Sequence, residues 1–414
     1  MSKPSTSGVT LPAWPDHDEW TIFCAAVDNY GDIGVCWRLA RQLVHEHGLS
    51  VNLFVDDWEK TLSFLGRLDA GLLSQTQEQG VRLCHWHDAV DWQAELSGSS
   101  LVIEAFGCAL PDTAITGMAT KTGTGNAGPC WLNLEYLSAE PWVESYHRQS
   151  SLTSTALSKT FFFPGFTAAT GGLLRECNLL AQHQHWQTDQ RQTRAELLQA
   201  LGINAQDLAE GWHSANLLVS LFAYTRPAGS RALSSWFAAM AEGGEPALCL
   251  VPAGDLLADV AGALGRTLIP SVGDVMTMGS LSVVVIPFLP MDDYDRLLSV
   301  CDLNLVRGED SFVRAQWAAK PLVWHIYPQQ DDAHRVKLDA FLARYGDTNG
   351  GADSREVLLE FNRFWNLDAD CGKLWHDLRP QLPDLIHGAR NWQQKLAELP
   401  DLASSLMQFY RNRP

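Results

Sequence analysis

Residues 21–55 of the chain read TIFCAAVDNYGDIGVCWRLARQLVHEHGLSVNLFV. The stretch opens on an apolar run that predicts a strand at 21–27, and it closes on a second apolar run that predicts a strand at 51–55. Between them, after Gly34, apolar residues recur at the spacing of a helix. Strand, turn, helix and strand in this order are typical of a βαβ unit with parallel strands. The stretch therefore predicts an α/β fold.

The same alternation continues through the rest of the chain, on both sides of a polar segment. In the first half we expect buried strands at 100–105 and 130–134. Residues 182–207 are rich in Gln, His and Arg before a helical pattern, and they predict the crossing between two halves. After this segment, short apolar runs predict five more strands, at 216–223, 247–251, 282–288, 302–306 and 322–326. Two successive α/β halves indicate two doubly wound domains that face a cleft.

Composition narrows the class of protein. The chain has 414 residues, 46% hydrophobic and 19% charged, which is the make-up of a folded globular protein. Its formal net charge is −18. Sequence-independent binding of nucleic acid needs a dense excess of Lys and Arg, which this chain lacks. Anionic membranes also repel an acidic surface. The nine cysteines form no CxxC pair, and the first 20 residues contain no apolar signal segment. We expect a reduced, cytoplasmic protein that binds neither nucleic acid nor membrane.

The loop after the first strand carries two carboxylates and two glycines, in the order Asp28-Asn29-Tyr30-Gly31-Asp32-Ile33-Gly34. Ligands of doubly wound folds bind beyond the carboxyl ends of the strands, and glycines let backbone approach a ligand closely. One aspartate could act as general base while the other orients a nucleophile. A turn aspartate and a helix-capping aspartate would explain the pair equally well. The loop lacks GxGxxG, so the sequence does not predict a nicotinamide enzyme.

A second strand-to-helix turn, Arg307-Gly308-Glu309-Asp310-Ser311, follows the predicted strand at 302–306. A helix N-terminus offers unpaired amides and the positive end of a dipole, which suit a diphosphate, and Ser311 adds a hydroxyl. Helix capping alone would also account for the acidic residues. The sequence contains no clear DxD motif in a suitable loop, and His85-Trp86-His87 lacks an evident third ligand, so we expect no metal.

Four blocks of the sequence together resemble one enzyme family, the bacterial elongation factor P arginine rhamnosyltransferases (EarP). The blocks are VDNYGDIGVCWRLARQL at 27–43, SLFAY at 220–224, IPFLPMDDYDRLL at 286–298 and VRGEDSFVRAQWAAKPLVWHIYPQQDDAH at 306–334. The resemblance spans roughly residues 20–400, and its specificity lies in the four blocks together.

The resemblance implies a GT-B fold, with two Rossmann-like domains facing a cleft. It implies an N-terminal, acceptor-side domain at 1–185, a C-terminal, nucleotide-sugar domain at 205–397 and a helix at 398–414 that returns to the first domain. The implied reaction transfers rhamnose from dTDP-β-L-rhamnose to an arginine of elongation factor P, with inversion and without a metal.

Site residues carry over from the matching blocks. The implied catalytic residues are Asp28, Asp32 and Glu309. The implied nucleotide-sugar-binding residues are Asn29, Tyr30, Gly31, Phe222, Tyr224, Phe288, Tyr294, Arg307, Gly308, Asp310, Ser311 and Gln330. Met291 departs from the resemblance, because a polar residue, often Gln, is expected near that position.

Two other functions fit part of the pattern. The first is a GT-B transferase with another nucleotide-sugar donor or a small-molecule acceptor. The second is a non-catalytic sugar-nucleotide sensor, which would keep the turn at 307–311 but would have no need of Asp28 and Asp32.

Overall fold

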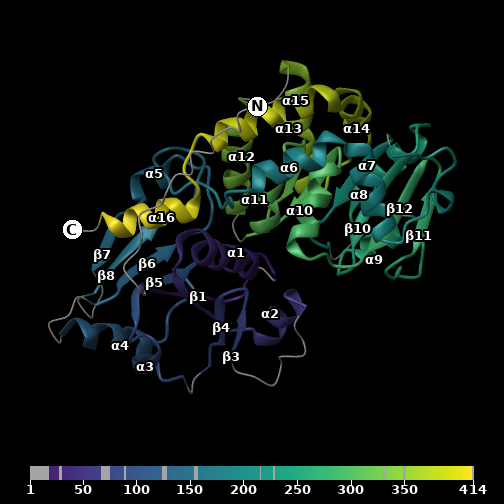
Figure 1. Cartoon of the computed structure of the whole chain (residues 1–414). Helices are drawn as coiled ribbons and strands as arrows, with labels where there is room; N and C mark the ends of the chain where they lie inside the picture. The colour runs from purple at the N-terminus through teal and green to yellow at the C-terminus, as the bar shows by residue number, and fades with distance from the viewer. Residues whose placement is uncertain are drawn as a thin grey trace, which may run out of the picture.

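Two β-sheets, one in each half of the chain, organise the structure (Figure 1). This computed structural model describes residues 18–27, 30–66, 75–87, 90–123, 128–152, 157–214, 216–226, 229–329, 332–347 and 351–412.

The sheet of the N-terminal half has eight strands in the order β3-β4-β2-β1-β5-β6-β8-β7. Its strands are β1 (Glu19–Cys24), β2 (Ser50–Val55), β3 (Gln75–Glu78), β4 (Val81–His85), β5 (Ser99–Ala105), β6 (Cys130–Leu134), β7 (Ser150–Leu152) and β8 (Ser158–Phe162). The two edge strands, β3 and β7, are antiparallel to their neighbours, and the six inner strands are parallel. The strand order reverses between β1 and β5, which makes their carboxyl ends the switch point of a doubly wound sheet.

Helix α1 links β1 to β2 and lies at the centre of the molecule. It begins at Gly31 and ends at His47, where Gly48 adopts the left-handed conformation (φ 68°) that closes helices. Most of its residues from Asp32 to Leu43 are buried. The other helices of this half are α2 (Trp58–Phe64), α3 (Trp92–Glu95), α4 (Asp112–Gly123) and α5 (Trp142–Tyr146).

The sheet of the C-terminal half repeats this topology with six strands in the order β11-β12-β10-β9-β13-β14. Its strands are β9 (Leu217–Leu221), β10 (Ala247–Pro252), β11 (Val275–Met278), β12 (Leu281–Ile286), β13 (Leu303–Arg307) and β14 (Leu322–His325). Only the edge strand β11 is antiparallel, and the order reverses between β9 and β13. The inner strands are continuous apolar runs, as expected where helices cover both faces of a sheet.

Helices cover both faces of this second sheet and connect the halves. The segment predicted as the crossing forms α6 (Leu179–Thr188) and α7 (Gln190–Ala200), which pack on α10. The remaining helices are α8 (Arg231–Glu242), α9 (Leu257–Ala263), α10 (Met291–Val300), α11 (Asp310–Trp317), α12 (Ala333–Gly346), α13 (Ala352–Asn366), α14 (Gly372–Leu378) and α15 (Leu382–Ala397).

The last helix, α16 (Leu402–Arg411), leaves the C-terminal half and lies beside α1 (Figure 1). The Tyr410 ring packs edge-on against Trp20 of β1, with ring centroids 5.1 Å apart. The Tyr410 hydroxyl also donates to Asp18 over 3.1 Å. The end of the chain therefore packs on the N-terminal half.

Two doubly wound domains on either side of a pocket confirm the predicted α/β, GT-B architecture. The predicted strands agree with the observed ones to within about three residues. Strands β3, β4, β7, β8 and β11 are not in the prediction. The parallel strands β4 (VRLCH) and β8 (SKTFF) mix polar with apolar residues, so they lack the continuous apolar run of the other inner strands. Helix α1 begins at Gly31 rather than after Gly34.

All nine cysteines are free thiols, and Cys24, Cys249 and Cys301 are buried in the core. Among the described residues, the helices are too short or too polar to cross a membrane.

Candidate functional site

A pocket lies between the two halves, at the carboxyl ends of the strands around the second switch point. The walls of the pocket include the residues that follow β9 and β13, helices α10 and α11, and the start of α1. It is lined by Tyr30, Gly31, Arg38, Phe64, Phe222, Tyr224, Pro252, Phe288, Leu289, Met291, Tyr294, Arg307, Gly308, Asp310 and Ser311. The ten predicted nucleotide-sugar-binding residues that the structure describes all line this pocket. Asp28, Asn29 and Gln330 lie outside the described residues.

Three aromatic rings from both halves meet at one side of the pocket. Tyr30 stacks on Phe64 with ring centroids 5.6 Å apart, and Phe288 of the C-terminal half packs against both, at 5.2 Å and 6.2 Å. Phe288 is 40% exposed and lies beyond the end of β12, although the sequence placed it in that strand. A flat ligand can therefore reach the face of this ring, because aromatic surfaces bind flat bases by stacking.

Arg307, at the carboxyl end of β13, brings a cation to the pocket. Its guanidinium lies over the rings of Phe222 and Tyr224, 4.4 Å and 4.9 Å from their centroids. The two rings follow β9, so the cation sits at the switch point between β9 and β13. A guanidinium held in this way suits recognition of a phosphate.

The turn after β13 presents the start of α11 to the pocket. Gly308 adopts a left-handed conformation (φ 63°), and α11 begins at Asp310. The Ser311 hydroxyl bonds to the backbone of Arg307, accepting from its N–H over 3.2 Å and donating to its carbonyl. Ser311 therefore closes the turn that places the amides of α11 at the pocket.

Helix α10 supplies two further lining residues. Burial raises the pKa of the Tyr294 hydroxyl well above its ordinary value, so this group stays protonated. The position at which the sequence departs from the resemblance, Met291, also lines the pocket and supplies a thioether there instead of a hydrogen-bonding group.

Asp32 lies in the first turn of α1 and is buried. Its Oδ2 accepts the N–H of Val27 over 2.9 Å, so the carboxylate fastens the loop between β1 and α1. Asp32 is absent from the pocket lining, although its neighbours Tyr30 and Gly31 belong to it. Both the catalytic and the loop-closing interpretation of this residue are compatible with that position.

Glu309 connects the two halves. Its Oε2 accepts the N–H of Leu137, the third residue after β6, over 2.9 Å, and the side chain is almost fully buried. It lies outside the pocket lining. Glu309 therefore lies where the turn after β13 meets the exit of a strand of the N-terminal sheet.

The exits of β5 and β6 form an aromatic and acidic edge beside Glu309. Phe106 and Tyr136 stack with ring centroids 4.5 Å apart, and the Lys337 ammonium lies 5.5 Å from the Tyr136 ring centroid. Burial raises the pKa of the neighbouring Glu135 carboxyl. This edge combines carboxylates with aromatic faces, the surroundings in which cationic side chains are bound.

Four pocket residues were missed from the sequence, namely Arg38, Phe64, Pro252 and Leu289. Arg38 interrupts the apolar helical pattern of α1 and is 1% exposed. A charged residue inside a buried helical stripe is the signal that could have found it, since buried arginines need partners. Phe64 ends α2 and carried no such signal.

Metal ligands do not gather in the described part of the chain, where no group of three or more His, Cys, Asp or Glu side chains could hold an ion. The rings of His85 and His87 lie 5.3 Å apart at the end of β4.

Comparison with known proteins gives one consistent family. The family model described as "Elongation-Factor P (EF-P) rhamnosyltransferase EarP" matches residues 20–411. A curated protein-arginine rhamnosyltransferase from Pseudomonas putida is 48% identical over 393 residues, which are 95% of this chain and 98% of that protein. A protein-arginine rhamnosyltransferase from Pseudomonas aeruginosa is 44% identical over 391 residues, which are 94% of this chain and 98% of that protein.

A solved structure that concerns EarP-mediated arginine glycosylation of translation elongation factor EF-P is also similar. It is 38% identical to this chain, superimposes with a TM-score of 0.65, and the match covers 96% of this chain and 99% of that one.

Proposed function

This chain belongs to the EarP family of elongation factor P rhamnosyltransferases, and we propose that it transfers L-rhamnose from dTDP-β-L-rhamnose to an arginine of EF-P. The observation that carries the proposal is the placement of all ten described nucleotide-sugar candidates around one pocket between the two domains. It is a glycosyltransferase, so the proposal concerns its donor, its acceptor and its chemistry.

The pocket suits a nucleoside diphosphate sugar. The thymine base would stack on the exposed face of Phe288. The diphosphate would meet the Arg307 guanidinium and the free amides at the start of α11. These positive groups would also stabilise the charge that builds up on dTDP as it leaves.

The acceptor arginine would approach from the N-terminal half. A guanidinium keeps its proton at any ordinary pH, and its delocalised lone pair makes it a weak nucleophile. Carboxylates bind its planar fork and polarise its N–H bonds. Among the described residues, Asp32, Glu309 and Glu135 supply carboxylates at the neighbouring strand exits.

The chemical step is a single displacement. One guanidinium nitrogen attacks the anomeric carbon as an Asp32 oxygen takes one of its protons. The new C–N bond forms on the face opposite the breaking C–O bond, so β-linked rhamnose becomes α-linked and dTDP leaves. The guanidinium loses one proton and gains one sugar, so the product keeps its positive charge. The N–H of Val27 would hold the Asp32 carboxylate in place during this step.

Intact-mass analysis of EF-P tests the proposal. EF-P incubated with the enzyme and dTDP-rhamnose should gain one deoxyhexose, and EF-P with the target arginine replaced by lysine should gain nothing. Transfer from another nucleotide sugar but not from dTDP-rhamnose would contradict the donor. Transfer to a small molecule without transfer to EF-P would contradict the acceptor. Binding of dTDP-rhamnose with neither transfer nor hydrolysis would identify a sensor instead of an enzyme.

A further inference from the structure

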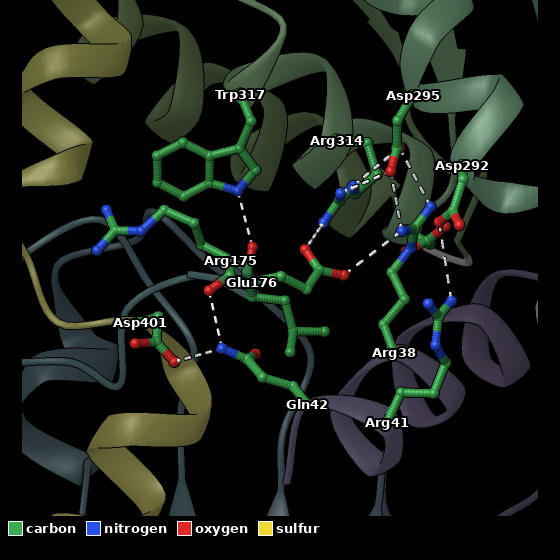
Figure 2. Close-up of polar contacts among 12 residues, drawn as sticks. Arg38, Arg41, Gln42, Arg175, Glu176, Asp292, Asp295, Arg314, Trp317 and Asp401 are labelled. Carbon is green, nitrogen blue, oxygen red and sulfur yellow. Dashed lines mark hydrogen bonds and ion pairs between the residues drawn. The ribbon is translucent and has the colours of Figure 1, made fainter. Parts of the chain in front are cut away.

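Five buried or largely buried charged side chains form a cluster between the two halves. Figure 2 labels four of them, Arg38, Glu176, Asp295 and Arg314. Arg38 comes from α1, Glu176 from the segment before α6, and Asp295 from α10. Asp310 and Arg314 come from α11. The cluster therefore joins the N-terminal half, the crossing segment and the C-terminal half at one point.

Arg38 holds two acids of the C-terminal half with one planar group. Its Nε donates to Asp310 Oδ1 over 2.9 Å, and its two Nη atoms donate to the oxygens of Asp295 over 3.1 Å and 3.2 Å. These partners lie 272 and 257 residues away in sequence. Only a guanidinium has the rigid fork that reaches both carboxylates at once.

The two acids depend on Arg38 to different degrees. Arg314 also binds Asp295, over 2.9 Å and 2.6 Å, and it binds Glu176 over 2.6 Å. Although burial raises the pKa of Glu176, Arg314 and Arg38 lower it to about 2. Asp310 differs from Asp295. Among the described side chains, Arg38 donates the hydrogen bond to Asp310, and burial raises the pKa of the Asp310 carboxyl. Removing Arg38 would therefore leave Asp310 without a direct cation while Asp295 kept one.

Arg38 and Asp310 join the two helices that follow the loops used by the proposed reaction. Asp310 starts α11 and lines the pocket, and Arg38 follows Asp32 on α1 by six residues. The first turns of the two helices touch: a Cβ on Gly34 would lie 3.1 Å from Cγ of Asp310. Farther along α1, Gln42 donates to the Arg175 carbonyl over 2.8 Å and to Asp401 over 3.0 Å, so the helix is held along its length (Figure 2).

We propose that Arg38 is a positioning residue for the transfer reaction. By holding Asp310, it fixes the first turn of α11 against the first turn of α1 and keeps the anomeric carbon of the donor within reach of Asp32. It also neutralises a carboxylate that would otherwise face the donor diphosphate unpaired. The inference rests on the proposed assignment of this pocket to the donor.

The test compares Arg38→Met with a matched control, Arg344→Met. Arg344 of α12 also joins the two halves, donating to the Ala139 carbonyl over 2.9 Å and to Glu144 over 3.0 Å, but it is partly exposed and lies outside the pocket lining. The measurements are the single-turnover rate at saturating dTDP-rhamnose, the Kd for dTDP and the thermal midpoint. Arg38→Met should lower the rate about 10- to 100-fold, as expected for misplaced reacting groups, and weaken dTDP binding. Arg344→Met should stay within about twofold of wild type in rate and Kd.

A double variant separates positioning from mere support of the fold. Adding Asp310→Asn to Arg38→Met should bring the Kd for dTDP back to that of Asp310→Asn alone, because the unpaired charge is gone. The inference would be overturned if the Kd of the double variant rose by the product of the two single effects. It would also be overturned if Arg38→Met and Arg344→Met had the same rate and Kd.

Arg38→Lys covers the case in which Arg38→Met fails to fold. The lysine keeps the buried charge but lacks the fork, so its rate should fall below that of wild type while dTDP binding is largely kept. A wild-type rate in Arg38→Lys would contradict the inference. Failure of the wild-type enzyme to transfer rhamnose at all would instead contradict the proposed function, so the two failures are distinguishable.

Discussion

The two halves of the molecule share one topology but differ in the side chains that follow their central strands. In the C-terminal half, the exits of β9 and β13 gather Arg307 and two aromatic rings around the start of a helix. In the N-terminal half, the exits of β1 and β6 lead to Asp32 and Glu135. The fold supplies two equivalent edges, and the proposed function assigns the diphosphate to one and the acceptor guanidinium to the other. Substitutions on each edge test this division of roles.

The largest effect is expected from Asp32→Asn, which keeps the shape of the side chain and removes its negative charge. Loss of a general base costs about 10²- to 10⁴-fold in rate. Single-turnover transfer to EF-P measures this. The matched control is Asp384→Asn, since Asp384 also lies in the first turn of a helix, α15, and also accepts a backbone N–H, that of Gly351 over 2.7 Å. Near-normal transfer by Asp32→Asn would remove Asp32 from the role of base.

Arg307→Met changes the C-terminal half, and it should lower the affinity for the donor. The change removes a charged hydrogen-bond donor, which is worth roughly 1.5–3 kcal/mol, so the Kd for dTDP should rise about 10- to 100-fold. Calorimetric titration with dTDP gives this value. Arg231→Met is the control, because that arginine of α8 is 71% exposed and lies outside the pocket lining. An unchanged Kd in Arg307→Met would place the diphosphate elsewhere.

Phe288→Ala should weaken dTDP binding by roughly tenfold, at the lower end of the ~1–3 kcal/mol that stacking of a base on an aromatic ring contributes. The expected loss is smaller because the ring already packs on Tyr30 and Phe64. Phe364→Ala offers a control of similar exposure, 36% against 40%, on α13. If both variants bind dTDP as wild type does, Phe288 does not contact the base.

The smallest effect is expected from chelation. The amides of α11 and the Arg307 guanidinium would stabilise the leaving diphosphate, so transfer should continue at an unchanged rate in excess EDTA. A need for added magnesium or manganese would assign that stabilisation to an ion instead.

The sequence predicts the centre of the fold better than its edges. Strands such as β10 and β12 are continuous apolar runs, and each was found within two residues of its observed ends. Strand β8 carries Lys159 beside its apolar residues, and β11 is a short, half-exposed edge strand, so neither has a pattern that stands out locally. Pairing with a neighbouring strand forms them, and no single stretch of sequence records that pairing.

The site shows the same distinction between residues that a local pattern reveals and residues that tertiary structure brings together. The loops at 28–34 and 307–311 are visible because glycines and acids follow apolar strands, and the resemblance added Phe222, Tyr224, Phe288 and Tyr294. Arg38 stands out in the sequence as a charge in an apolar helical stripe, but its partners Asp295 and Asp310, more than 250 residues away, come from the fold alone. Partnerships across the two halves depend on tertiary structure, and local patterns do not encode them.

The most direct test of opposite roles for the two halves is the affinity of Asp32→Asn for dTDP-rhamnose, measured by calorimetry on the same preparation that is assayed for transfer. If Asp32 serves the acceptor side alone, the Kd should stay within about twofold of wild type while transfer is lost. Loss of donor binding together with transfer would contradict the account and would make Asp32 a residue that holds the loop, as its hydrogen bond from Val27 already allows.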